Sequence, residues 1–179
     1  MRFLAGALAG LVIVEPRVFE DERGFFLETW HRAKFAEAGI DVEFVQDNHS
    51  QSRAGVIRGL HYQLRQPQGK LVRVVRGAIL DVAVDLRRSS STFGKWSAIE
   101  LSDTNRRQLY LPPGFAHGFC VLSEQAEVIY KCTALYDAGD ERTLLWKDPD
   151  IGIAWPALDP VLSAKDLSGV PLSQAETFA

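Results

Sequence analysis

Apolar runs rich in β-branched and aromatic residues recur along the chain at intervals of about eight to twelve positions, separated by Gly, Pro, Asp or Ser. This spacing favours a β-sandwich or β-barrel over alternating strands and helices. The runs that we interpret as strands are residues 11–14, 24–30, 42–46, 55–62, 70–75, 78–86, 96–101, 107–111, 127–136 and 141–146. The predicted fold is therefore all-β, a jelly-roll sandwich or barrel with one or two short helices.

The clearest alternation lies in residues 78–86. Aliphatic side chains occupy every second position from Leu80 to Leu86. Asp81 and Asp85 occupy positions between them. Because a strand places successive side chains on opposite faces, this pattern predicts a half-buried strand. One face is expected to pack in the core, and the other is available for polar chemistry.

Helical signals are confined to short segments. Residues 32–38 form the one convincing helix, because HRAKFAEAG ends at Gly39, a residue that readily adopts the left-handed conformation after a helix. A second helical piece is expected after Pro160. The apolar stretch Phe3–Val14 follows a basic residue, as in a signal peptide, but it lacks a small-residue cleavage site and is too short to span a membrane. We interpret it as the first strand.

Length and composition indicate one globular domain. No linker, repeat or low-complexity segment divides residues 1–179. The formal net charge of -3 provides no general attraction to nucleic acid or to an anionic membrane, so neither is expected as a partner. Cys120 and Cys132 lie in apolar runs and are too few for a disulfide framework, which favours buried, reduced thiols and a cytoplasmic location.

The strongest candidate for chemistry is a group of basic side chains on two neighbouring predicted strands. RGLHYQ supplies Arg58 and His61, and QGKLVRVVRG supplies Lys70. Imidazole titrates near neutral pH and the two cations attract phosphate or enolate oxygens, so the group indicates acid–base work on an anionic substrate. In a regular strand Arg58 and His61 would face opposite sides. A shared site therefore requires a bulge, which Gly59 permits.

A metal centre is the main alternative for two histidines in such a barrel. Metal-binding barrels of this kind use a His-x-His pair, but Gln63 stands two residues after His61, and Lys70 would repel a divalent cation. No metal is therefore expected. The second histidine, His117 in PPGFAHGF, lies where a turn leads into a strand. That motif alone supports a turn residue and a functional residue equally, and the presence of His61 favours the functional interpretation.

Other candidates have ordinary structural explanations when each is taken alone. Tyr130 shares a strand face with apolar neighbours, which is the pattern of a core tyrosine, although a phenol can also donate a proton. Asp166 in LSAKD is a typical loop acid, although a carboxylate can orient an imidazole. Arg23 and Glu28 in DERGFFLE are surface charges unless that segment covers a ligand.

Taken together, the motifs resemble those of the dTDP-4-dehydrorhamnose 3,5-epimerase family, a branch of the cupin superfamily. The resemblance extends from about Leu11 to Leu167 and keeps the motifs in order. They are DERGFFLE, FVQDNHS, RGLHYQ, QGKLVRVVRGAILDVAVDLR, STFGKW, NRRQLYLPPGFAHGF, YKCTALY and LSAKD. The resemblance implies a cupin-like jelly-roll enzyme without metal or cofactor. It also implies a homodimer with exchanged N-terminal strands and a dTDP-4-keto-6-deoxyhexose as substrate.

The resemblance also implies roles for the candidate residues. His61, oriented by Asp166, would remove a proton, and Tyr130 would deliver one to the opposite face of the sugar. Lys70 would stabilise the enolate oxygen. Around the nucleotide and sugar the family pattern places Arg23, Glu28, Gln46, Asn48, Arg58, His117, Tyr136, Glu141 and Lys165. The ring of Tyr136 is suited to stacking on thymine.

The implied reaction inverts C3 and C5 of dTDP-4-dehydro-6-deoxy-D-glucose and gives dTDP-4-dehydro-L-rhamnose. One open alternative is an enzyme of a deoxysugar tailoring pathway that inverts only C3 or only C5, because such relatives share most of these motifs. Another is a cupin that binds a nucleotide sugar without turnover. The combination of His61, Lys70, Tyr130 and Asp166 argues against the second alternative.

Overall fold

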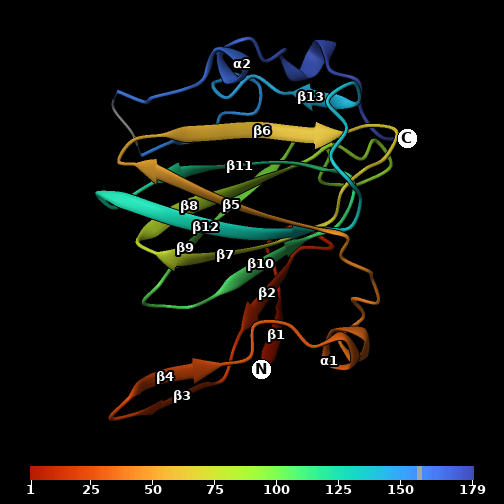
Figure 1. Ribbon diagram of the computed structural model, residues 1–179. Coiled ribbons are helices and arrows are strands. Elements are labelled where there is room, and N and C mark those ends of the chain that lie inside the picture. The colour runs from red at the N-terminus through yellow and green to blue at the C-terminus, as the bar shows by residue number, and fades with distance from the viewer. Residues whose placement is uncertain (157–158) are drawn as a thin grey trace.

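Two antiparallel sheets packed face to face form the body of the protein (Figure 1). The structure is a computed structural model that describes residues 1–156 and 159–179. A two-stranded hairpin and a short helix from the N-terminal region lie outside this body, and short helical turns follow near the C-terminus. The predicted all-β jelly-roll fold with short helices is confirmed.

The larger sheet has six strands in the order β1-β2-β10-β7-β12-β5. In that order the strands are β1 Arg2–Ala5, β2 Val12–Glu15, β10 Gln108–Leu111, β7 Lys70–Arg76, β12 Gln125–Cys132 and β5 Gln46–Arg53. The smaller sheet has five strands in the order β13-β6-β11-β8-β9. These are β13 Glu141–Thr143, β6 Ile57–Gln63, β11 Phe115–Val121, β8 Ala78–Asp85 and β9 Trp96–Ser102.

The N-terminal region projects from the two-sheet body as an arm. Strands β3 (Val18–Asp21) and β4 (Gly24–Leu27) pair as a hairpin that extends below the sheets in Figure 1. Helix α1 (Arg32–Glu37) follows and ends before Gly39, as predicted. Its residue Phe35 is buried beneath the larger sheet in a cluster with apolar side chains of β2 and β10. Truncating a buried phenylalanine typically costs about 3–5 kcal/mol, so this contact anchors the base of the arm.

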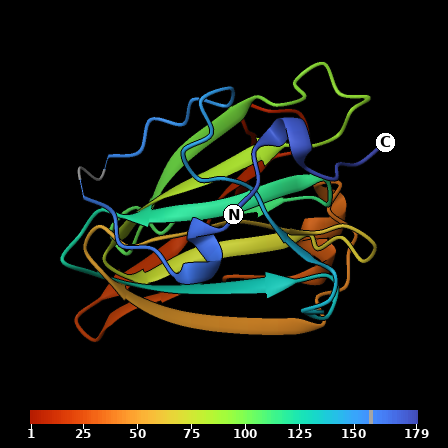
Figure 2. The same cartoon turned by 90° about the horizontal axis from the view of Figure 1, so that it is seen from above.

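The C-terminal segment covers the outer face of the smaller sheet. In Figure 2 the helix α2 (Ala164–Leu167) and the chain beyond it lie over the strands of that sheet. The 3-10 helix η1 spans Leu172–Gln174, and the Tyr62 hydroxyl donates a hydrogen bond of 2.6 Å to the backbone oxygen of Glu176. The helical piece predicted after Pro160 is therefore present. Among the described residues, no helix is long and apolar enough to cross a membrane.

The prediction of one first strand over Phe3–Val14 is wrong. The segment forms two antiparallel strands, β1 and β2, in which Phe3 is paired with Val14. The backbone N–H of Gly6 donates to the oxygen of Leu11 over 2.8 Å, and Gly10 has a φ of 100°, so the chain reverses between them. Apolar residues on both arms of this hairpin gave the appearance of one continuous strand.

The prediction of a strand over residues 42–46 is also largely wrong. The strand begins only at Gln46 and continues through the polar sequence QDNHSQSR, because this edge strand turns polar side chains toward a pocket. Val42 and Phe44 instead pack against the cluster around helix α1. The prediction thus took apolar residues that pack around helix α1 to be part of the strand.

Strand β8 confirms the predicted alternation, but not the predicted half-burial. Ile79 and Ala83 face the core between the sheets, whereas Val82 and Val84 pack beneath the C-terminal segment. Asp81 and the other acid of the strand are both fully buried. Both faces of the strand are covered, because the smaller sheet lies between the larger sheet on one side and the C-terminal segment on the other.

Candidate active site

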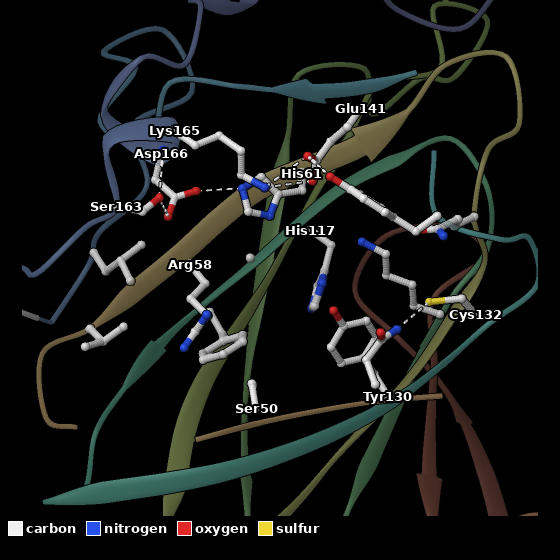
Figure 3. A pocket seen from close by; sticks show the side chains of 18 of the residues that line it. Ser50, Arg58, His61, His117, Tyr130, Cys132, Glu141, Ser163, Lys165 and Asp166 are labelled. Carbon is white, nitrogen blue, oxygen red and sulfur yellow. Dashed lines mark hydrogen bonds and ion pairs between the residues drawn. The ribbon is translucent and has the colours of Figure 1, made fainter. Parts of the chain in front are cut away.

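A pocket of about 610 Å³ opens between the two sheets. Strands β5, β7 and β12 of the larger sheet, strands β6, β11 and β13 of the smaller sheet, and the segment around α2 contribute its walls. The predicted site residues that line it are Gln46, Asn48, Arg58, His61, Lys70, His117, Tyr130, Tyr136, Glu141, Lys165 and Asp166. Segments far apart in sequence therefore converge on one cavity (Figure 3).

His61 and Asp166 form a short contact in this pocket. The imidazole Nε2 lies 2.6 Å from Oδ1 of Asp166. The carboxylate is buried on the first turn of α2, where the Ser163 hydroxyl donates to its Oδ2 over 2.7 Å and accepts from its backbone N–H over 3.1 Å. Burial alone would raise the pKa of Asp166, but the hydrogen bonds from His61 and Ser163 lower it below its usual range.

The ionised carboxylate determines which imidazole atom can act as a base. An Asp166 anion accepts the proton of Nε2–H, so the neutral His61 ring carries its lone pair on Nδ1. Protonation at Nδ1 then produces an imidazolium next to a carboxylate, which stabilises it. His61 is thus equipped to take a proton from a molecule in the pocket.

A bulge in β6 brings Arg58 and His61 to the same cavity. His61 pairs with His117, whereas Arg58 pairs with Phe119, so β6 has one extra residue in this interval. Gly59 has a φ of 117°, and a Cβ atom there would lie 2.6 Å from the Cα of the facing glycine on β11. The bulge that the sequence required is present, and only glycine fits it.

Strand β5 of the larger sheet holds Arg58 at the wall of the pocket. Its Nε donates to the Ser52 hydroxyl over 3.0 Å, and its Nη2 donates to the backbone oxygen of Gln51 over 3.2 Å. Both contacts are neutral, so the guanidinium keeps its full charge for an anion in the cavity.

Lys70 begins β7 and is buried in the wall of the pocket. Desolvation lowers the pKa of its ammonium group, and the nearby ionisable groups of Cys132, Glu141 and Asp81 act in the opposite direction. No described residue forms a hydrogen bond or ion pair with the Lys70 ammonium. It is therefore available to an oxygen atom of a bound molecule.

Tyr130 lies on the wall opposite His61. Tyr130 belongs to β12 of the larger sheet and His61 to β6 of the smaller sheet, and Figure 3 shows both side chains at the same cavity from opposite sides. Burial raises the pKa of the Tyr130 phenol above its ordinary value. The hydroxyl therefore remains protonated at neutral pH and can serve as a donor.

His117 is paired with a second buried carboxylate. Its Nε2 lies 2.7 Å from Oδ1 of Asp81, which is fully buried on the adjacent strand β8. This contact fixes the orientation of the His117 ring, which favours a functional role for the residue. The sequence analysis missed this role of Asp81, although its position among the aliphatic residues of β8 was the available signal.

A linked group of polar side chains surrounds the mouth of the pocket. Glu141 accepts two hydrogen bonds from Lys165, at 2.9 Å and 3.0 Å, and one of 3.0 Å from the Tyr136 hydroxyl. Burial opposes ionisation of Glu141, but Lys165 and the neighbouring His61 and Tyr136 lower its pKa overall. Gln46 accepts from the backbone N–H of Tyr136 over 2.7 Å, and its amide donates to Asn48 over 3.0 Å.

Arg23 and Glu28 do not line the pocket of their own chain. Arg23 pairs with Asp21 at the tip of the β3–β4 hairpin, and Glu28 accepts a hydrogen bond of 2.7 Å from Lys34 on α1. Both are located on the projecting arm. The structure therefore separates these two predicted binding residues from the rest of the predicted site.

Sequence reasoning did not single out the remaining lining residues, because small polar, apolar and thiol side chains do not by themselves indicate acid–base chemistry. They are Ser50, Val56, Ile57, Gln68, Gly118, Phe119, Cys132, Val161, Leu162 and Ser163. Within residues 1–156 and 159–179, no group of three or more His, Cys, Asp or Glu side chains could hold a metal ion.

An imidazole and a phenol on opposite walls of one cavity can take a proton from one side of a bound molecule and return one to the other. Fold and pocket together define a jelly-roll enzyme of the epimerase type. Residues 5–174 match the sequence model of the dTDP-4-dehydrorhamnose 3,5-epimerase family. The chain belongs to that family.

Individual relatives agree with this assignment. The chain is 53% identical to the dTDP-4-dehydrorhamnose 3,5-epimerase of Methanothermobacter thermautotrophicus, over 99% of this chain and 97% of the relative. It is equally similar, at 53%, to the enzyme of the same name from Shigella flexneri, over 99% of each chain. The crystal structure of a dTDP-6-deoxy-D-glucose-3,5-epimerase from Legionella pneumophila, in complex with dTDP-4-keto-L-rhamnose, superposes with a TM-score of 0.95. The two chains are 45% identical over 98% of this chain and 94% of the other.

Proposed function

We propose that this chain, acting as a single domain, is the 3,5-epimerase that converts dTDP-4-dehydro-6-deoxy-D-glucose into dTDP-4-dehydro-L-rhamnose. The observation that supports the proposal most directly is the placement of the His61–Asp166 pair and Tyr130 on opposite walls of one cavity. Inversion at a carbon centre requires a base on one face and an acid on the other, and this arrangement supplies both.

The C4 ketone of the substrate provides the acidity on which the reaction depends. It flanks both C3 and C5, so loss of either proton leaves an enolate with its negative charge on the C4 oxygen. The buried Lys70 ammonium, which no described residue pairs with, is our candidate for stabilising that oxygen. Because Lys70 is buried, such a charge interaction is stronger there than in water.

Two proton transfers complete each inversion. His61 Nδ1 removes the proton from one face, and the Tyr130 hydroxyl protonates the enolate carbon from the other face. This sequence leaves His61 protonated and Tyr130 as a phenolate, so the two residues must exchange a proton with solvent before the next cycle. The hydrogen that enters the sugar therefore comes ultimately from water. Repetition at the second carbon gives double inversion.

The remaining lining residues suit the nucleotide diphosphate. Arg58 and Lys165 supply positive charge for the phosphates, and the half-exposed ring of Tyr136 offers a face for thymine. Gln46, Asn48, His117 and Glu141 provide donors and acceptors for the sugar and the nucleoside. These assignments belong to the proposal and can be tested by substitution.

The proposal includes a homodimer in which each arm reaches the pocket of the partner. Its support is the position of Arg23 and Glu28 on a projecting arm that also exposes three phenylalanines: Phe19, Phe25 and Phe26 are 50%, 61% and 70% exposed. Exposed aromatic side chains of this number usually mark an interface. A cytoplasmic location, in which the buried thiols stay reduced, is also part of the proposal.

Mixing two inactive variants tests the exchanged arm. If Arg23 of one subunit serves the pocket of the other, subunit exchange between Arg23→Ala and His61→Asn dimers creates hybrids with one complete site. Random mixing would then restore about a quarter of the wild-type activity. No recovery in samples that contain hybrid dimers would contradict the exchange.

Product stereochemistry tests the proposed activity. The protein is incubated with dTDP-4-keto-6-deoxyglucose and a 4-keto reductase that traps the product, and the trapped sugar is analysed by NMR. We expect dTDP-L-rhamnose, in which both C3 and C5 are inverted. Inversion at one carbon only would assign the chain to a mono-epimerase of a tailoring pathway. Unchanged sugar despite dTDP binding would indicate a binding protein.

A further inference from the structure

Gln63 is a buried polar residue of β6 that takes no part in the proposed proton transfers. The residue stands two positions after His61, where metal-binding barrels of this type carry a ligand, but its side chain does not line the pocket. It is 2% exposed and lies opposite Glu141 in the β6–β13 ladder. Burial of an amide is costly unless its donors and acceptor are satisfied.

The Gln63 amide is hydrogen-bonded to the residues on either side of Tyr136 and to the β6–β7 loop. Its Nε2 donates to the backbone oxygen of Leu135 over 3.2 Å, and its Oε1 accepts from the backbone N–H of Asp137 over 2.9 Å. The second Nε2 proton goes to the backbone oxygen of Gln66 over 2.9 Å. One side chain therefore fixes the residues immediately before and after Tyr136 and links them to the β6–β7 loop.

A second buried side chain joins the chain that follows Tyr136 to the β6–β7 loop. Asp140, fully buried, accepts hydrogen bonds from the backbone N–H groups of Arg65 and Gln66 at 2.8–2.9 Å. These bonds join the end of the Tyr136 segment to the β6–β7 loop. Together with Gln63 they form a hydrogen-bonded support for the backbone around Tyr136, whose side chain is about half exposed.

From this geometry we infer that Gln63 is a positioning residue for nucleotide binding, which acts by holding Tyr136 at the mouth of the pocket. The inference rests on the proposed function, in which Tyr136 stacks on the thymine base. An aromatic ring contributes most to affinity when its position is fixed before the ligand arrives, because little freedom is then lost on binding. Loss of the support should therefore weaken dTDP binding more than it slows proton transfer.

The test is a double-mutant cycle with dTDP as the probe. The dissociation constant of dTDP is measured by calorimetry for wild type, Gln63→Met, Tyr136→Ala and the double variant. Methionine keeps the length of the side chain and adds no charge. We expect Gln63→Met to weaken binding about tenfold when Tyr136 is present and less than about twofold in the Tyr136→Ala background. At saturating substrate, kcat should fall by less than about threefold.

Tyr62→Phe is the matched control. It removes one buried hydrogen bond from the adjacent residue of β6, directed at Glu176 in the C-terminal segment instead of at the Tyr136 segment. It should lower the melting temperature without changing dTDP affinity. If Gln63→Met does not fold, Gln63→Asn keeps an amide that is too short to bridge the same groups, and it should show the same dependence on Tyr136.

The outcomes separate this inference from the function on which it rests. Equal losses of affinity in the presence and absence of Tyr136, or unchanged affinity in the Gln63 variants, would overturn the positioning role while leaving the epimerase intact. Failure of the wild-type protein to bind dTDP would overturn the proposed function and, with it, the inference.

Discussion

Nε2 of His61 lies 2.6 Å from Oδ1 of Asp166, although 105 positions separate the two residues in the chain. The contact joins a strand of the smaller sheet to the first turn of α2, and the Ser163 hydroxyl holds the other oxygen of the carboxylate. The C-terminal segment thus orients the proposed base as well as covering the sheet.

Replacing His61 by asparagine should abolish most of the activity. Because general acid–base catalysis typically contributes about 10²–10⁴-fold, we expect His61→Asn to reduce kcat by a factor in that range. His49→Asn is the control, since His49 pairs with Glu127 and does not line the pocket. Steady-state kinetics with circular dichroism would check both variants, and near-wild-type turnover of His61→Asn would refute its role as the base.

Replacing Tyr130 by phenylalanine should separate proton removal from proton return. The His61–Asp166 pair remains, so loss of substrate deuterium from C3- or C5-labelled sugar should continue, while formation of the inverted product falls by about 10²-fold or more. Washout and inversion can be followed together by NMR. Equal slowing of the two processes would indicate that Tyr130 positions the substrate instead of donating a proton.

The alkaline limit of activity should reflect Lys70. The ammonium stabilises the enolate only while protonated, and burial lowers its pKa from the ordinary value of 10.5, so activity should decline as pH rises through a value below 10.5. Burial moves the pKa of the Tyr130 phenol in the opposite direction, above its ordinary value of 10.0. In Lys70→Arg the declining limb of log kcat/KM should move to higher pH, because guanidinium retains its proton. A limb at the same pH in both proteins would contradict the assignment.

Substitution of Gly59 should damage the fold and the site together. In Gly59→Ala the new Cβ would meet the backbone of β11 at 2.6–2.7 Å, in addition to the strain of a φ of 117°. We expect a loss of unfolding free energy of more than about 1 kcal/mol, measured by urea denaturation. Gly24→Ala is a matched control, because Gly24 has a φ of 119° and no atom within 4 Å of the added Cβ. Similar losses in both variants would show that close packing at Gly59 is unimportant.

Local patterns in the sequence allowed the β architecture and the basic group of Arg58, His61 and Lys70 to be predicted, whereas most other pocket residues were predicted only through the resemblance to a known family. Periodicity located the strands around Leu80 and Val72, and the need for a bulge at Gly59 followed from the spacing of Arg58 and His61. These features depend on local alternation and on backbone sterics, which are encoded over a few neighbouring residues.

The features that could not be predicted depend on contacts between distant segments. The polar strand β5 forms because its side chains face a cavity that only the assembled sheets create. The burial of Asp81, the support of Tyr136 by Gln63, and the position of Arg23 on an arm depend in the same way on tertiary neighbours. Apart from the position of Asp81 among aliphatic residues, the pattern along the chain carries no direct signal for such pairs.

The most direct test of two-sided proton transfer by His61 and Tyr130 is the reaction in deuterated water with a 4-keto reductase to trap the product. Because His61 and Tyr130 exchange protons with solvent in each cycle, we predict one deuterium at C3 and one at C5 of the trapped L-sugar. His61→Asn should incorporate deuterium about 10²–10⁴-fold more slowly. An inverted product without solvent deuterium, or unchanged labelling in His61→Asn, would contradict two-sided proton transfer between these residues.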